Sequence, residues 1–128
     1  MVKLQRQVEE FHRTFGQDIA GIPSSPSGES VVLRCRLIQE EFDELRQALD
    51  TGSVVDIADA IGDLLYVVYG TAVSCGIDME PITDEIHRSN MSKVGGHRRA
   101  DGKWIKPESY EPANLQPILQ EQIDGSRR

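Results

Sequence analysis

Hydrophobic residues recur at helical spacing in four stretches of the chain, and no stretch keeps the strict alternation of a half-buried strand. Within each stretch the apolar positions repeat every three or four residues, so that they line one face of a helix. A glycine stands near the end of each stretch, where helices commonly stop. The pattern predicts an all-α fold with helices at about residues 2–15, 30–49, 53–76 and 78–93.

The third predicted helix is the most apolar of the four. At its start Ser53 and Asp56 make a capping-box-like pair, with Asp standing where Glu or Gln is usual. Nearly all of its middle is hydrophobic, so we expect this helix at the centre of a four-helix bundle. Because a chain with 5% aromatic residues makes a modest core, we also expect further burial against a second copy, in a homodimer or a tetramer.

Prolines and glycines mark the segments between and after the helices. Residues 16–30 contain several of both, which predicts a loop. Three prolines and further glycines after residue 94 predict an extended tail. We expect the tail to wrap the bundle through four apolar side chains: Tyr110, Leu115, Ile118 and Leu119. The length of 128 residues fits a single domain, with a helical core over about 1–94 and a basic loop and tail over about 95–128.

Composition narrows the class of protein. With 38% hydrophobic and 27% charged residues, the chain can build a core but carries too much charge for a membrane protein. No apolar run approaches the roughly 18–20 residues that span a bilayer, and the first residues have no apolar signal segment. We therefore expect a cytoplasmic protein in which Cys35 and Cys75 are buried thiols rather than a disulfide.

Charge is distributed unevenly along the chain. The net charge of −7 argues against a general nucleic-acid-binding protein. Residues 87–107, here called the basic segment, hold six cations and one acid and so carry +5. The rest of the chain holds eight cations and twenty acids and so carries −12. An acidic body thus carries one basic segment near its C-terminal end.

Acidic side chains gather on one face of each of the two central helices, because residues three, four and seven apart share a helical face. These acids are Glu40, Glu41 and Glu44 in the second helix, and Asp56, Asp59 and Asp63 in the third. Asp63 stands among apolar residues, so we expect its carboxylate to be partly buried. A buried carboxylate is disfavoured unless it is paired, hydrogen-bonded or bound to a cation.

Carboxylates brought together from two antiparallel helices repel one another unless a divalent cation neutralises them. All-oxygen ligands favour hard ions, so Mg²⁺ is the first candidate and Mn²⁺ the second. Zinc is disfavoured because the histidines are isolated in sequence. The basic segment, through Lys93, Lys103 and Lys106, would then grip phosphates that the metal leaves exposed.

Several segments, in this order, resemble the all-α nucleoside triphosphate pyrophosphohydrolases, the superfamily of MazG, dimeric dUTPases and phosphoribosyl-ATP pyrophosphohydrolase. The similar segments are FHRTFG, LRCRLIQEEFDEL, DIADAIGDLLYVVYGTA, HRSNMSK and DGKWIKPESYEP. The family hallmark is ExxE on one helix and ExxD on the next, which bind Mg²⁺. Glu41 and Glu44 match ExxE, and Asp63 matches the Asp of ExxD. The Glu of ExxD falls on Ala60, a departure from the family pattern: either Asp59 replaces that ligand, or that metal position is weaker or absent.

The resemblance implies an enzyme that hydrolyses a nucleoside triphosphate, such as dUTP or another dNTP, to the monophosphate and pyrophosphate, as housecleaning of the nucleotide pool. Water would attack the α-phosphorus, and Glu40, next to the first motif Glu, is the candidate to orient or deprotonate that water. Asn90 and Lys93, in HRSNMSK, would contact phosphate or sugar.

Two other functions fit the same residues. The first is hydrolysis of phosphoribosyl-ATP. The second is a non-catalytic helical oligomer whose acidic face binds cations or a basic protein. Three roles also stay open: Asp56 serves as helix cap or metal ligand, and Trp104 and Tyr66 either stack on a nucleobase or pack within the protein.

Overall fold

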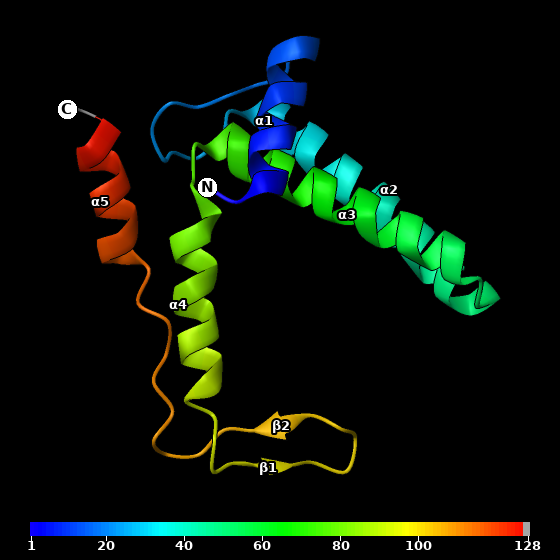
Figure 1. Ribbon diagram of the computed structural model, residues 1–128, viewed down its shortest axis with the longest axis vertical. Coiled ribbons are helices and arrows are strands. Elements are labelled where there is room, and N and C mark those ends of the chain that lie inside the picture. The colour runs from blue at the N-terminus through cyan, green and yellow to red at the C-terminus, as the bar shows by residue number, and fades with distance from the viewer. Residues whose placement is uncertain (127–128) are drawn as a thin grey trace.

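The computed structural model describes residues 1–126 and is mostly helical (Figure 1). Five helices and one two-stranded hairpin follow one another along this part of the chain: α1 (Lys3–Phe15), α2 (Gly28–Thr51), α3 (Val54–Cys75), α4 (Met79–Met91), β1 (His97–Arg98), β2 (Trp104–Ile105) and α5 (Gln116–Ser126). The all-α class predicted from the sequence is confirmed, and the first four helices fall close to their predicted positions.

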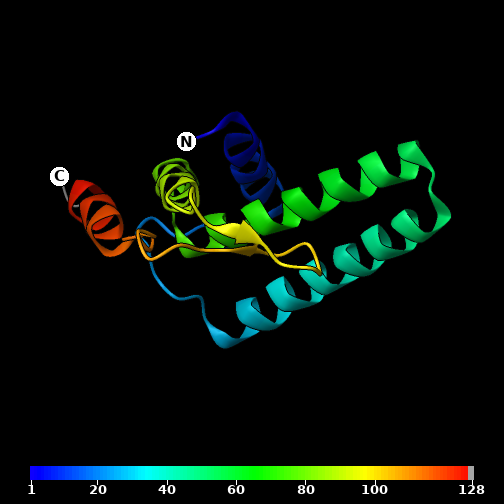
Figure 2. The ribbon, with the colours of Figure 1, turned by 90° about the horizontal axis from the view of Figure 1, so that it is seen from below.

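The long helices α2 and α3 lie side by side as an antiparallel pair, and α1 packs against α3 near its C-terminal end (Figures 1 and 2). The chain reverses between α2 and α3 at Gly52, whose φ of 75° is one that glycine adopts easily. The Ser53 hydroxyl then accepts a hydrogen bond from the Asp56 backbone N–H, at 3.4 Å, which caps α3 as the sequence predicts. We call α1, α2 and α3 the body.

A buried polar contact ties the three helices of the body together. His12 of α1 is 2% exposed, and Arg34 of α2 is 4% exposed. The His12 Nδ1 atom lies 2.8 Å from the Asp18 carbonyl oxygen, so Nε2 is the nitrogen that meets Arg34 Nη1, at 3.4 Å. Arg34 Nη2 donates to the Val67 carbonyl of α3, at 3.2 Å. Gly70 makes room for the guanidinium, because a Cβ there would lie 2.6 Å from Arg34 Nη2.

Helix α4 turns away from the body instead of packing as a fourth helix of a bundle (Figures 1 and 2). The predicted four-helix bundle is therefore wrong for the single chain. Gln5 of α1 fixes the α3–α4 connection: its side chain donates to the Ile77 carbonyl, at 2.6 Å, and accepts from the Met79 N–H, at 3.0 Å. Because both partners are backbone groups, these hydrogen bonds do not depend on the side chains of Ile77 and Met79.

The tail folds back along α4, so the prediction of an extended tail around the bundle is wrong in two ways. It contains the hairpin and α5, and it follows α4 rather than the body (Figure 1). Ser89, near the end of α4, donates to the Glu111 carbonyl, at 2.7 Å. Gln122 of α5 exchanges two hydrogen bonds of 2.9 Å with the backbone of Asp78. We call α4, the hairpin and α5 the arm.

The body leaves many large apolar side chains exposed. Along α2 and α3 they are Val31, Val32, Leu33, Phe42, Leu49, Val54, Val55, Ile61, Leu65 and Val68. Cys35 is exposed too and Cys75 half-buried, both as free thiols, so the expected burial is wrong for Cys35. Among the described residues, α3 alone is long and apolar enough to cross a membrane by length and composition, with 28% of that stretch buried in this chain. It carries three aspartates and packs on α1 and α2.

Candidate metal centre

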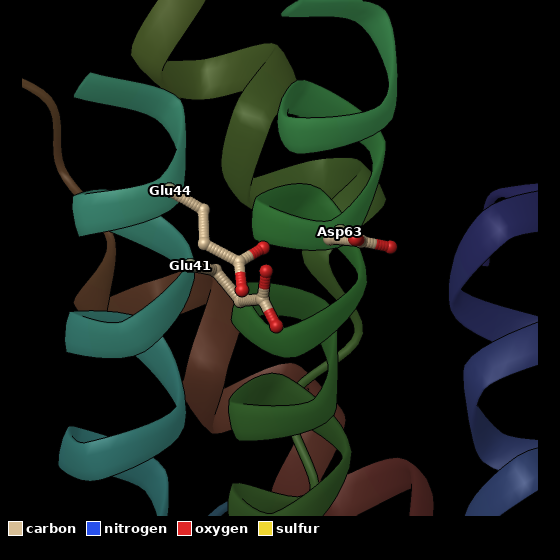
Figure 3. Close-up of side chains that lie close together, drawn as sticks. All are labelled: Glu41, Glu44 and Asp63. Carbon is tan, nitrogen blue, oxygen red and sulfur yellow. The ribbon is translucent and has the colours of Figure 1, made fainter. Parts of the chain in front are cut away.

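Three carboxylates meet between α2 and α3 (Figure 3). Glu41 and Glu44 lie one turn apart on α2, with side chains that reach toward α3, where Asp63 lies. One oxygen from each of the three residues lies within 4.8 Å of the other two. We call these residues the carboxylate cluster. The structure thus brings together the three acids that match the ExxE and ExxD motifs.

Two of the three carboxyl groups, those of Glu41 and Asp63, have a raised pKa. The pKa of Glu41 is raised mainly because its carboxyl group loses hydration, and then because the charges of Glu44 and Asp63 are close. The pKa of Asp63 is raised mainly by loss of hydration, and then by the charges of Asp59 and Glu44. Asp63 is nevertheless exposed, so the expectation of a partly buried Asp63 is wrong. Two of its apolar neighbours on α3, Ile61 and Leu65, are themselves 45% exposed.

A hard divalent cation fits this cluster. The Glu41 Oε2 atom is buried and has no hydrogen-bond partner among the described residues. An unpaired buried carboxylate oxygen is unfavourable, and a bound cation would satisfy it while offsetting the repulsion between the acids. The donors are all carboxylate oxygens, which suit Mg²⁺ and Mn²⁺. The arrangement can therefore bind a metal ion.

Asp59 and Asp56 lie beside the carboxylate cluster rather than in it. Both line a groove of about 220 Å³ that also touches Glu44 and Ala60. Asp59 is exposed on α3 and acts on the cluster through its charge, which helps raise the pKa of Asp63. Ala60 is 4% exposed within the body, so a glutamate at that position would need space that neighbouring residues now occupy.

The other predicted site residues are distributed over two places. Glu40 is exposed on α2, next to Glu41. Asn90 is exposed on the last turn of α4, and the basic segment continues from there into the hairpin. The Nζ atoms of Lys106 and Lys93 lie 4.6 and 5.8 Å from the centre of the Tyr110 ring. The hairpin, whose turn contains Lys103, stands at the end of α4 that lies away from the body (Figure 1).

An aromatic groove next to the cluster was missed by the sequence patterns. It has a volume of about 420 Å³ and is lined by Gln7, Glu10, Phe11, Thr14, Phe15 and Tyr66. The helical spacing of Phe11 and Phe15 predicts that both face a core, yet Phe15 is 67% exposed. Three aromatic residues that converge from two helices could not be seen before the packing of α1 on α3 was known.

The chain is similar to a curated protein and to the model of one protein family, and the family model covers the carboxylate cluster. The chain is 39% identical over 77 residues to uncharacterized protein L479 of Acanthamoeba polyphaga mimivirus, a match that covers 57% of this chain and 31% of that protein. The chain therefore spans about a third of the length of this curated relative. The model of the family described as phosphoribosyl-ATP pyrophosphohydrolase matches residues 8–90, which include nearly all of the body and α4 up to Asn90. Because this match covers more than half of the chain, the protein belongs to the phosphoribosyl-ATP pyrophosphohydrolase family.

Proposed function

We propose that the protein hydrolyses a nucleoside triphosphate to the monophosphate and pyrophosphate with Mg²⁺ held at the carboxylate cluster. The observation that carries this proposal is the convergence of Glu41, Glu44 and Asp63, with one buried oxygen left unpaired, in a chain of this family. Within residues 1–126 these three acids form no ion pair, and acids that repel one another without a cationic partner suit a bound cation better than they suit stability.

Each acid near the cluster has a distinct role in this proposal. Glu41, Glu44 and Asp63 hold the cation, and Asp59 adds a ligand from the adjacent groove. The cation polarises phosphate oxygens and offsets the charge that develops on the pyrophosphate leaving group. Glu40, exposed beside Glu41, orients the attacking water and accepts its proton. Mn²⁺ supports the same arrangement.

The substrate in this proposal is dUTP or another dNTP, which makes the protein a cytoplasmic housecleaning enzyme of the nucleotide pool. The family description favours a second candidate, phosphoribosyl-ATP, which carries the same triphosphate chemistry. Competition between the two substrates for the same enzyme separates these alternatives.

We also infer that two copies of the chain assemble through the apolar side chains exposed along α2 and α3. A homodimer would cover surface that one chain leaves open. It would also explain why the basic segment stands away from its own acids, since Lys93, Lys103 and Lys106 could reach the carboxylate cluster of the second copy. Asn90 would join them at the end of α4. The opposite charges of body and basic segment favour this pairing.

The activity is tested with purified protein, Mg²⁺ and a panel of nucleoside triphosphates that includes phosphoribosyl-ATP, by identifying the products. We expect release of pyrophosphate, and a loss of about 10²-fold or more in Glu41→Gln, because the cation loses a ligand. Asp43→Asn is the matched control, since Asp43 lies on the same helix and pairs only at the surface, with Gln39 and Arg46. Cation binding without turnover of any substrate would instead identify the non-catalytic oligomer.

Assembly is tested by sedimentation and by mixing variants. We expect the wild type to sediment as a dimer or tetramer and Val68→Glu, on the exposed face of α3, to shift toward the monomer. Mixing Glu41→Gln with Lys103→Ala should restore part of the activity that each variant lacks alone, because some sites would then contain both intact residues. Absence of such recovery from a mixed oligomer would contradict a site shared between copies.

A further inference from the structure

The aromatic groove lies beside the carboxylate cluster. Tyr66 follows Asp63 by three residues on α3, so the two side chains share a helical face and stand about 5 Å apart along the helix axis. In Figure 3 the carboxylate of Asp63 extends from α3 on the side where α1 lies. Helix α1 supplies the opposite wall of the groove through Phe11 and Phe15. A molecule bound at the cluster can therefore extend into the groove.

The aromatic rings leave a flat apolar surface open. The Phe11 and Phe15 rings have centroids 4.5 Å apart, and Phe11 meets Tyr66 edge to face at 5.6 Å. Phe11 is thus held between two rings, whereas Phe15 is 67% exposed. An aromatic ring held by its neighbour but left open to water is a stacking surface for another flat ring.

The rest of the groove is polar and can read the edge of a base. Gln7, Glu10 and Thr14 supply an amide, a carboxylate and a hydroxyl. Nearby carboxylates accept hydrogen bonds from exocyclic amino groups, whereas they repel a carbonyl oxygen. The volume of about 420 Å³ lies within the roughly 300–1,000 Å³ of small-molecule sites.

We propose that this groove binds the nucleobase of the substrate, with Phe15 as the stacking residue and Glu10 favouring bases that carry an exocyclic amino group. The inference rests on the proposed function, because the carboxylate cluster fixes where the phosphates lie. Adenine, cytosine and guanine offer Glu10 an exocyclic amino group, whereas uracil offers only carbonyl oxygens and a ring N–H. Among the substrates of the proposed function, the groove therefore favours a dNTP with an amino-bearing base over dUTP.

The test is calorimetric binding of non-hydrolysable α,β-methylene analogues of dATP, dCTP and dUTP, with inorganic tripolyphosphate as a ligand that has no base. We expect Phe15→Leu to bind the dATP and dCTP analogues about tenfold more weakly than the wild type, since a stacking surface is lost. Tripolyphosphate should bind both proteins equally. Because Phe15 is exposed, the variant should keep the thermal stability of the wild type, which a melting curve checks.

A matched pair of charge variants tests whether Glu10 selects the base. Glu10→Gln should reduce the preference for the amino-bearing analogues over the dUTP analogue, whereas Glu9→Gln should not, because Glu9 pairs with Arg13 outside the groove. Unchanged binding in Phe15→Leu, or a wild-type preference for the dUTP analogue, would overturn the base site. Base-dependent binding without hydrolysis would contradict the proposed function but not the base site. Hydrolysis with an unchanged KM in Phe15→Leu would contradict the base site but not the proposed function.

Discussion

The body and the arm are held together in different ways. In the body, side chains from three helices meet in the interior, where His12 and Arg34 are almost fully buried. In the arm, a tail is attached along one helix mostly by hydrogen bonds at the surface, with Ile82 and Ser89 as the buried residues of α4. Elements with few buried apolar contacts open at lower free energy than a packed core. The carboxylate cluster therefore stands on the region with the packed core, and most of the basic segment stands on the region that opens more easily.

The largest change in stability is expected in the body, at Gly70 of α3. Gly70→Ala should lower the free energy of unfolding by about 1–3 kcal/mol, because the added Cβ would press on Arg34 Nη2 and His12 Nε2. Gly62→Ala is the control on the same helix. It meets no atom within 4 Å and should raise stability by about 0.5–1 kcal/mol. Urea titrations of both variants measure the difference, and equal destabilisation would contradict a tight contact at Gly70.

Magnesium should stabilise the body without tightening the arm. At one hundred times its dissociation constant, a ligand that binds only the folded state adds about 2.7 kcal/mol. We expect Mg²⁺ to raise the Tm of the wild type and to have little effect on Glu41→Gln, which lacks one of the three converging carboxylates. Hydrogen exchange should slow in α2 and α3. A shift of equal size in both proteins would place the cation elsewhere.

The arm should loosen when a single buried hydroxyl is removed. Ser89→Ala removes the shorter of two hydrogen bonds to the Glu111 carbonyl, at 2.7 Å, and leaves the one from the Ser92 hydroxyl, at 3.4 Å. The loss should weaken the attachment of the tail to α4 by about 1 kcal/mol. We expect faster hydrogen exchange over residues 95–126 and no change in the body. In the control Thr83→Ala, the lost hydroxyl bonds only within α4, to Met79 and Glu80. Faster exchange in α1–α3 would show that arm and body unfold together.

The smallest effect concerns pH, because the acids of the cluster remain in contact with solvent. A raised pKa means that the folded state binds the proton more tightly than the unfolded state does. The stability that this binding contributes is present at low pH and is lost as pH rises through the raised pKa. Without metal, Glu41→Gln should therefore exceed the wild type in stability near pH 7, and the difference should vanish toward pH 4. Thermal melts at several pH values measure it.

Local patterns predicted the helices of the body well. Ser53 and Gly76 mark the ends of α3 in the sequence and in the structure, because caps depend on residues next to one another. Helical spacing predicts an acidic face on each of two adjacent helices, and the resemblance to the ExxE and ExxD motifs indicates which of these acids meet. Helical spacing does not determine side-chain directions, so it could not show that Glu41, Glu44 and Asp63 form the cluster while Asp59 lies to one side.

The arm was beyond these patterns for physical reasons. Amphipathic spacing predicts α4 but does not say which surface it packs on. Each strand of the hairpin has two residues, too few to show an alternating pattern. Pro117 contributes to the prediction of an extended tail, yet it lies in the first turn of α5, where a proline is compatible with a helix. The exposure of Asp63 has the same cause: the sequence does not show which surfaces pack together. Apolar neighbours predict burial only where another element covers them.

Gln5 has a consequence for how the two regions cooperate. Its amide spans the joint between α3 and α4 by bonding to Ile77 on one side and Met79 on the other. Helix α1 thus holds the angle between α3 and α4, and with it the orientation of the basic segment relative to the body. Gln5 itself belongs neither to the carboxylate cluster nor to the basic segment. Loss of these two hydrogen bonds would leave the body and the arm folded but would free them to change their relative orientation.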